Sequence, residues 1–153
     1  YLGKNFGLKR GYLFRKGHTI QFSPKDLQKI KSMNALFEKN PFAPPSLEVI
    51  QDVVGNDLLE TLLFLEELIS VDNSIVFRKK EFEYMKKQLI EFLERNGAIT
   101  LSQFRDVLST SRKYALAFLE YMDQIGVTER VGEARRLKRS SPAEISNSNI
   151  KAK

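Results

Sequence analysis

The chain has 153 residues, of which 42% are hydrophobic, and its formal net charge is +6. It contains no cysteine and a single histidine, His18, which excludes disulfides, thiolate chemistry and the usual sets of zinc ligands. Its apolar runs are much shorter than the roughly eighteen residues of a membrane span, and its first residues lack the apolar core of a signal peptide. These features predict a globular, cytoplasmic protein without a membrane partner or a bound metal.

The charge is distributed unevenly along the chain. Residues 1–23 carry five Lys and Arg residues and no acidic residue. Residues 24–80, the first unit, carry seven basic against nine acidic residues, whereas residues 81–139, the second unit, carry eleven against nine. Because a polyanion is attracted by an excess of positive charge, a nucleic-acid contact is expected in the second unit.

The N-terminal segment has the pattern of a β-hairpin. Strand-like residues flank Lys16-Gly17, which has the composition of a turn. An isolated hairpin is marginally stable in water. Residues 1–23 are therefore expected to be the end of a preceding winged-helix domain, and the single His18 is expected to have a role in the turn or in packing.

The first unit is predicted to be mainly helical. Ser23 and Pro24 are an N-cap serine and an N1 proline, which start a helix that runs to about Lys39. Gly55 separates two further apolar runs. The remaining expected elements are helices over 47–54 and 56–70 and a short hairpin over 71–78.

The second unit repeats the plan of the first. Apolar residues recur at helical spacing over 81–95, and Asn96-Gly97 stops this helix. The next expected elements are a short strand over 98–100, helices over 101–108 and 111–125, and a hairpin of 127–131 with 135–138 that turns at Gly132-Glu133. The predicted fold class is mainly α with short β-hairpins, in tandem winged-helix (winged helix-turn-helix) domains, followed by a disordered tail over 140–153.

The helix over 111–125 carries its positive charge at its start. The residues expected to face the core are Ala115, Phe118, Leu119, Met122 and Ile125, and those expected on the other side are Arg112, Lys113, Ala117, Glu120, Tyr121 and Gln124. Arg112 and Lys113 lie beside unpaired backbone N–H groups, with Ser109, Thr110 or Ser111 available as caps. Basic residues oppose the helix dipole there, and a bound anion would relieve this. A solvated helix end is the equally weighted alternative.

Other basic residues could extend this pair into a patch. They are Arg105 on the preceding helix and Arg130, Arg135, Arg136, Lys138 and Arg139 around the final hairpin. Arginine is also ordinary on the solvent face of a hairpin, so the geometry of the patch, and not its charge count, decides between the two interpretations.

Three runs of residues resemble a known protein family. They are Leu108–Ala115 (LSTSRKYA), Leu119–Asp123 (LEYMD) and Gly126–Arg135 (GVTERVGEAR). Across about 98–137 the chain strongly resembles the last winged-helix domain of the bacterial selenocysteine-specific elongation factor, SelB. Over 9–80, Gly17-His18, Leu27 and Pro44-Pro45-Ser46 are similar to the preceding winged-helix domain and its approach.

The resemblance implies an RNA-binding function. It implies a C-terminal part of a translational GTPase whose last domain recognises the apical loop of a selenocysteine insertion (SECIS) hairpin in mRNA, directing selenocysteine incorporation at UGA. The implied RNA-binding residues are Arg105, Ser111, Arg112, Lys113, Arg130 and Arg135, although the family also reads looped-out bases with backbone groups. Glu133-Ala134 departs from the more basic hairpin expected at this place.

The resemblance also assigns partners outside this chain. The ribosome and selenocysteyl-tRNA would be bound through other domains of the parent protein, as would GTP and Mg. The phosphate-binding pattern G-x-x-x-x-G-K-[ST] does not occur in the sequence, so this chain is expected to have no cofactor of its own and not to be an enzyme. The first unit, 24–80, is interpreted as a spacer between the RNA-binding unit and the GTPase.

Two other functions are compatible with the pattern. Most winged helices bind duplex DNA, so a DNA-binding transcriptional regulator is one alternative. It would have few base-reading cations beyond the first helical turn, because Ala117, Glu120, Tyr121 and Gln124 follow there. The second alternative is a protein-interaction module, which the charge balance favours for the first unit.

Overall fold

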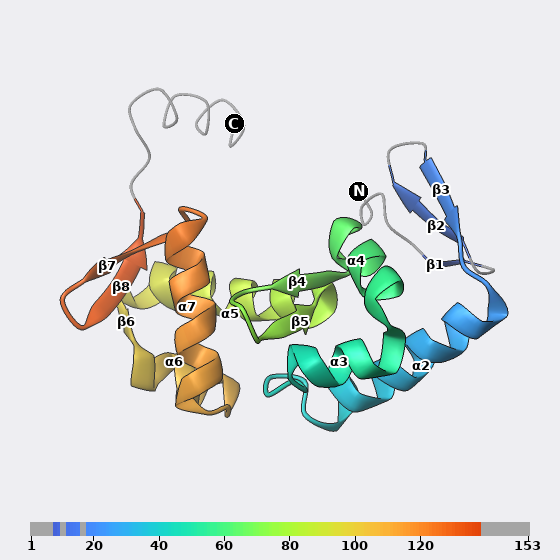
Figure 1. Ribbon diagram of the computed structural model, residues 1–153. Coiled ribbons are helices and arrows are strands. Elements are labelled where there is room, and N and C mark those ends of the chain that lie inside the picture. Colours follow the sequence, from blue (N-terminus) through green and yellow to red (C-terminus); the bar gives the residue numbers. More distant parts are fainter. Residues whose placement is uncertain (1–7, 10–11, 16–17, 139–153) are drawn as a thin grey trace.

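The computed structural model describes residues 8–9, 12–15 and 18–138 (Figure 1). The expected turn at Lys16-Gly17 and the expected tail over 140–153 lie outside the described residues. Among the described residues, every helix is too short or too polar to cross a membrane. The first sheet pairs β1 (Leu8–Lys9), β2 (Tyr12–Arg15) and β3 (His18–Gln21) in that order. β2 and β3 are the strands of the expected hairpin, whereas β1 is an additional strand that the sequence did not predict.

The described elements have the order that the sequence predicts for tandem winged helices. The first unit contains α2 (Pro24–Lys39), α3 (Leu47–Val54), α4 (Asn56–Phe64), β4 (Leu68–Ser70) and β5 (Val76–Arg78). The second contains α5 (Lys79–Asn96), β6 (Ile99–Thr100), α6 (Leu101–Leu108), α7 (Arg112–Gln124), β7 (Thr128–Val131) and β8 (Ala134–Leu137). The fold class, mainly helical with short antiparallel sheets in a winged-helix arrangement, is confirmed.

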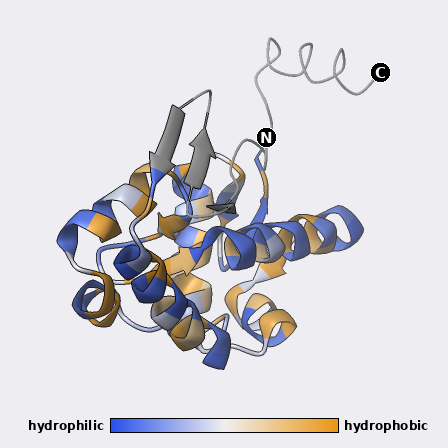
Figure 2. Cartoon of the chain, turned by 90° about the vertical axis from the view of Figure 1, so that its right-hand side faces the viewer, coloured by the Kyte–Doolittle hydropathy of each residue, from blue (hydrophilic) through white to orange (hydrophobic). Residues whose placement is uncertain are grey.

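Local signals fix most of the helix starts and ends. The Ser23 hydroxyl accepts the N–H of Asp26 at the start of α2, and Thr100 forms a capping box with Gln103 at the start of α6. Gly97 ends α5 with a φ of 84°, a conformation that glycine adopts without a Cβ clash. Hydrophobic residues gather toward the middle of the molecule (Figure 2).

One predicted boundary is wrong. The helix expected over 56–70 ends at Phe64, and residues 68–70 form strand β4 instead. Glu66 has a φ of 62°, which turns the chain out of the helix and lets Leu68 enter the N-terminal core as a strand residue. The expected strand residues Val71-Asp72 lie in the turn, where the Asp72 carboxylate accepts the N–H groups of Ser74 and Ile75, both at 2.8 Å.

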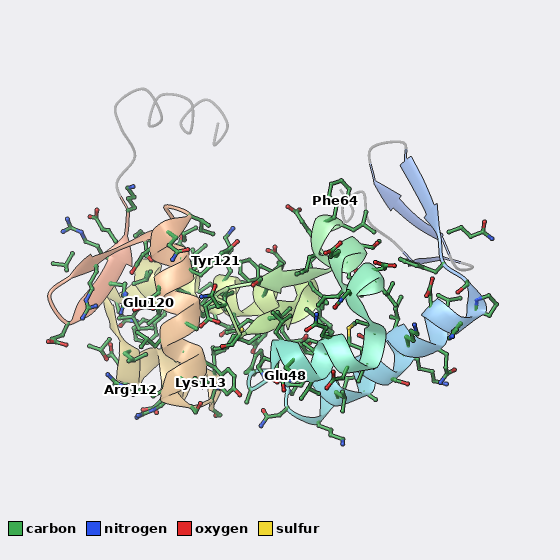
Figure 3. All side chains as sticks on the ribbon, viewed as in Figure 1. Glu48, Phe64, Arg112, Lys113, Glu120 and Tyr121 are labelled. Carbon is green, nitrogen blue, oxygen red and sulfur yellow. The ribbon has the colours of Figure 1, made fainter. Side chains whose placement is uncertain are left out.

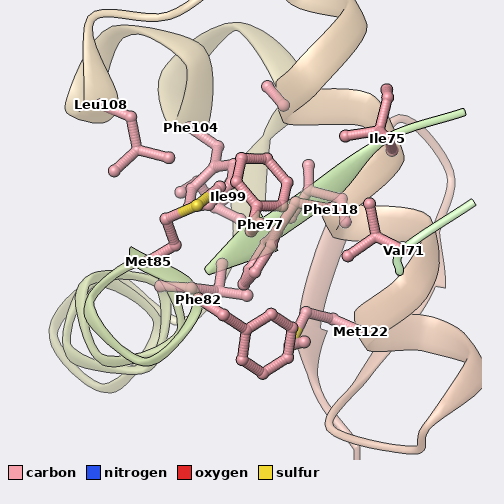
Figure 4. Close-up of a cluster of buried hydrophobic side chains, with 14 of the residues drawn as sticks. Val71, Ile75, Phe77, Phe82, Met85, Ile99, Phe104, Leu108, Phe118 and Met122 are labelled. Carbon is pink, nitrogen blue, oxygen red and sulfur yellow. The ribbon is translucent and has the colours of Figure 1, made fainter. Parts of the chain in front are cut away.

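Two hydrophobic cores meet at the hairpin β4–β5. The N-terminal core contains Phe22, Ile30, Met33, Phe37, Ile50, Val54, Leu58, Leu59, Leu62, Leu65, Leu68 and Val76. The shared core contains Val71, Ile75, Phe77, Phe82, Met85, Leu89, Leu93, Ile99, Phe104, Leu108, Ala115, Ala117, Phe118, Leu119 and Met122 (Figure 4). Because strand side chains alternate between faces, Val76 enters one core and its neighbour Phe77 enters the other. The hairpin of the first unit thus completes the core of the second.

The shared core changes the expected faces of α7. Ala117 and Tyr121 were expected on the exposed side, but Ala117 is buried and Tyr121 is half-buried with its ring 5.8 Å from that of Phe82. Ile125, expected in the core, is 46% exposed. Ala117 and Tyr121 are covered because β4–β5 and its turn supply apolar residues to the core on a second face of α7.

The side chain of Arg78 ties the start of α5 to α2. The Arg78 guanidinium donates to both carboxylate oxygens of the buried Glu81, at 2.7 and 2.8 Å, and to Asn34 on α2 at 3.3 Å. The hydrogen bonds from Arg78 to Glu81 raise the pKa of the guanidinium above its usual value, so it stays charged. Two-point pairing with further hydrogen bonds is the geometry in which a buried charge pair is best compensated.

The carboxyl group of Glu67 gives the fold a pH dependence of defined sign. Burial raises its pKa above the usual value for glutamate, against a smaller lowering by the charge of Lys79. The folded state therefore binds the Glu67 proton more tightly than the unfolded state does. Protonation of Glu67 stabilises the fold fully at a pH below the usual pKa of glutamate, and this stabilisation is lost as the pH rises through the raised pKa. We expect Glu67→Gln to reduce the fall in unfolding free energy that occurs as the pH rises above the usual pKa of glutamate, measured by urea titrations over a series of pH values. An unchanged slope would contradict the burial of this charge.

Candidate nucleic-acid interface

The basic start of α7 is built by a tight connection from α6. Ser109 ends α6 in the left-handed conformation, with a φ of 52°, and Ser111 is the N-cap residue of α7. The Thr110 N–H donates to the Arg105 carbonyl at 3.1 Å, which holds this connection against the last turn of α6. The structure therefore brings Arg105 and the first turn of α7 to one end of the second unit.

Arg112 and Lys113 are exposed at this end of the helix (Figure 3). Among the described residues, neither forms an ion pair with a carboxylate, and the Ser111 side chain makes no capping hydrogen bond. The Lys113 ammonium lies 5.4 Å from the centre of the Tyr114 ring, a cation–π distance. The first turn thus presents unpaired N–H groups, a serine hydroxyl and two positive charges to solvent, which is a surface that can bind an anion.

Arg105 lies near this turn with a partner of its own. Its Nε is 3.2 Å from the neighbouring Asp106 carboxylate, and the two side chains are 39% and 72% exposed. An ion pair so exposed contributes little to stability, so a phosphate can replace the carboxylate at small cost.

The basic residues of the final hairpin lie apart from the first turn of α7. The hairpin β7–β8 follows the C-terminal end of α7, whereas Arg112 and Lys113 are at its N-terminal end (Figures 1 and 3). Arg130 is exposed and donates to the Gly132 carbonyl at 3.2 Å, and Arg136 is paired with Glu129 at 2.7 Å. Arg139 lies outside the described residues. Arg130 can therefore contribute to a larger contact but is not part of the cluster around Ser111.

Arg135 is buried and does not lie on the expected contact surface. Its side chain is 3% exposed, and its Nε donates to the Asp123 carboxylate at 3.2 Å. Asp123 also accepts the Thr128 hydroxyl at 2.6 Å. The pairing buries this guanidinium inside the unit, so the expectation that Arg135 contacts phosphate is corrected: it joins α7 to the hairpin.

This role of Arg135 predicts a loss of stability on substitution. Arg135→Met keeps the length of the side chain but leaves the Asp123 carboxylate with Thr128 as its remaining side-chain donor among the described residues. An under-satisfied, partly buried charge of this kind is expected to cost about 1–3 kcal/mol of unfolding free energy. Urea unfolding followed by circular dichroism measures this, with Arg130→Met as the exposed control. Equal stability of both variants would contradict the structural role.

Two contacts at the same end were not found from the sequence. The Thr110 hydroxyl donates to the Phe42 carbonyl at 2.6 Å, and the Tyr114 hydroxyl donates to the Pro44 carbonyl at 3.4 Å. From the sequence, Thr110 is a candidate cap of α7 and Tyr114 has no predicted role. Hydrogen bonds between residues 68 or 70 positions apart produce no periodic or local pattern in the sequence, so the three-dimensional structure is needed to find them.

Comparisons with known proteins agree with this arrangement. Residues 91–137 match the family model described as elongation factor SelB, winged helix. A selenocysteine-specific elongation factor of Desulfomicrobium baculatum is 24% identical over 129 residues, which cover 80% of this chain and 20% of that protein. The chain thus spans about a fifth of the length of this relative.

Two solved structures share the fold. One is the mRNA-binding domain of elongation factor SelB from E. coli in complex with SECIS RNA, with a TM-score of 0.60, 23% identity, and coverage of 77% of this chain and 100% of that one. The other is a bacterial selenocysteine-specific elongation factor, EF-Sec, with a TM-score of 0.58, 24% identity, and coverage of 85% and 22%. At these identities the similarity establishes the winged-helix fold.

Proposed function

We propose that the second unit binds the apical loop of a SECIS hairpin in mRNA, because residues 91–137 match the family model described as elongation factor SelB, winged helix. The binding would direct selenocysteine incorporation at UGA. The observation that carries the proposal is the exposed, basic first turn of α7, which lies inside the matched region. Arg105, Ser111, Arg112 and Lys113 are the proposed contact residues, with Arg130 as an outer phosphate contact.

The chemistry of this end of α7 suits an RNA loop. Loops splay bases and phosphates outward, whereas the major groove of A-form RNA is too narrow for side chains to read. The two cations and the free N–H groups form a short contact edge, while Glu120 and Gln124 are exposed further along the helix. A duplex lying along the whole helix would meet the Glu120 carboxylate, so the charge distribution supports a compact loop over a DNA major groove.

The comparisons support an RNA ligand through the solved relative. That relative is the mRNA-binding domain of a SelB protein, crystallised with SECIS RNA, and its whole length is covered by this chain. Within the proposal, residues 24–80 are a spacer and residues 81–139 are the RNA-binding domain. The ribosome, selenocysteyl-tRNA, GTP and Mg would be bound elsewhere in a longer factor.

A competition between nucleic acids tests the proposal. The chain is titrated with an RNA hairpin library, with the same stems lacking loops, and with a duplex DNA pool, all at one salt concentration. We expect the tightest binding to a subset of RNA hairpins, with a log–log salt slope that corresponds to a few phosphates. Preference for duplex DNA would support a transcriptional regulator instead, and absence of binding at low salt would point to a protein-interaction module.

A further inference from the structure

The loop between α2 and α3 contacts the start of α7. This loop, residues 40–46, lies beside the N-terminal end of α7 (Figure 1). Its Phe42 carbonyl accepts the Thr110 hydroxyl at 2.6 Å, and its Pro44 carbonyl accepts the Tyr114 hydroxyl at 3.4 Å. The two hydrogen bonds bracket residues 111–113, which are the proposed RNA contact. The first unit thus reaches the RNA-binding end of the second.

The loop is itself held firmly. Prolines at positions 41, 44 and 45 restrict its backbone, and Pro44 is buried. The Phe42 ring stacks on Tyr84 of α5 with centroids 5.5 Å apart and planes at 20°, and it packs against the shared core. The ring contact with Tyr84 therefore anchors the loop to α5, in addition to the two hydrogen bonds that join the loop to Thr110 and Tyr114.

The start of α7 has few stabilising features of its own. The Ser111 side chain makes no capping hydrogen bond with the described residues, and the basic residues Arg112 and Lys113 oppose the helix dipole. A helix that begins in this way frays most easily at its first turn, and contacts from outside the helix can offset this. The Tyr114 ring, placed through its hydroxyl at Pro44, also lies under the Lys113 ammonium.

We propose that Thr110 and Tyr114 are positioning residues, which use the loop 40–46 to hold the first turn of α7 in its RNA-binding conformation. This inference rests on the proposed function. The hydroxyl groups fix the turn before RNA arrives, so the RNA does not have to order it. Such preorganisation lowers the entropic cost of binding. The first unit, interpreted above as a spacer, thereby also supports the binding site.

The first test removes one hydroxyl group from the full chain. Thr110→Val keeps the shape of the side chain, and we expect it to weaken binding of the best RNA hairpin about three- to tenfold, the equivalent of one net hydrogen bond. Thr110→Ser retains the donor and should restore affinity close to that of the original chain. Tyr114→Phe should have a smaller effect in the same direction, because its hydrogen bond is longer.

A second variant separates positioning from direct contact with RNA. Phe42→Leu removes the stacking on Tyr84 and leaves the RNA-contacting side chains unchanged. We expect it also to weaken hairpin binding, and the Phe42→Leu/Thr110→Val double variant to lose less than the sum of the two single effects, because both act through one contact. Loss of affinity in Thr110→Val together with unchanged affinity in Phe42→Leu would overturn the proposal and assign Thr110 a direct RNA contact.

Hydrogen exchange without RNA tests the positioning independently of the proposed function. The Thr110 N–H donates to the Arg105 carbonyl and the Ala115 N–H donates to the Ser111 carbonyl, so both report on the start of α7. We expect faster exchange of these amides in Thr110→Val and unchanged exchange in the middle of α5. Unchanged exchange of Thr110 and Ala115 would overturn the positioning role even if hairpins bind. If the original chain binds no hairpin, the proposed function fails, whereas exchange still decides whether the loop holds the helix.

Discussion

Replacement of Arg112 by alanine is expected to weaken binding of the recognised RNA hairpin by about 1–3 kcal/mol without unfolding the chain. The side chain is exposed, forms no ion pair with the described residues and lies outside both cores, so its removal leaves the packing intact. The Arg112→Ala/Lys113→Ala variant should also flatten the log–log salt dependence by about 1.4, since each phosphate contact in a single strand contributes about 0.7. Titrations at several salt concentrations measure both quantities.

Lys31→Ala is the matched control for this experiment. Lys31 is exposed on α2 in the first unit, so its replacement removes one positive charge without touching the proposed interface. We expect its effect on affinity to be within about 0.5 kcal/mol. An equal loss in Lys31→Ala and Arg112→Ala would mean that net charge drives binding, and an unaltered affinity in Arg112→Ala would remove the first turn of α7 from the proposed site.

The second large effect is expected from Phe77→Ala. Phe77 belongs to the hairpin of the first unit, is fully buried and meets Phe118 of α7 edge to face, with centroids 6.3 Å apart. Its truncation should lower the free energy of unfolding by about 3–5 kcal/mol, because it removes a large apolar side chain and leaves a cavity. Urea unfolding at fixed pH, followed by circular dichroism, gives this value.

Ile125→Ala provides the comparison for the core prediction. This apolar residue of the second unit is 46% exposed, and we expect its truncation to cost about 0.5 kcal/mol or less. The thermal unfolding of Phe77→Ala should remain a single transition that includes the signal of the second unit, since the shared core crosses the boundary between the units. A separate early transition confined to the first unit would contradict that sharing.

Much of the fold could be predicted because its signals are local. Ser23-Pro24 at the start of α2 and Gly97 at the end of α5 mark element boundaries by their own backbone chemistry. The end of α4 could not be predicted in this way, because its apolar residues continue through Leu68-Ile69 and suit a helix as well as a strand. The left-handed Glu66 and the burial of Leu68 decide the boundary, and both depend on the surrounding core.

The candidate site also combines features that could be predicted from the sequence with features that could not. The basic helix start at Arg112 and Lys113 could be predicted from the sequence, because helical periodicity and cap residues are properties of neighbouring positions. The pairing of Arg135 with Asp123 inside the unit and the hydrogen bond from Thr110 to the Phe42 carbonyl are visible in the three-dimensional structure alone. Charge counts and spacing show which residues are present. Burial and long-range hydrogen bonds depend on how distant segments pack against one another. This packing determines which cations and hydroxyl groups remain available to RNA.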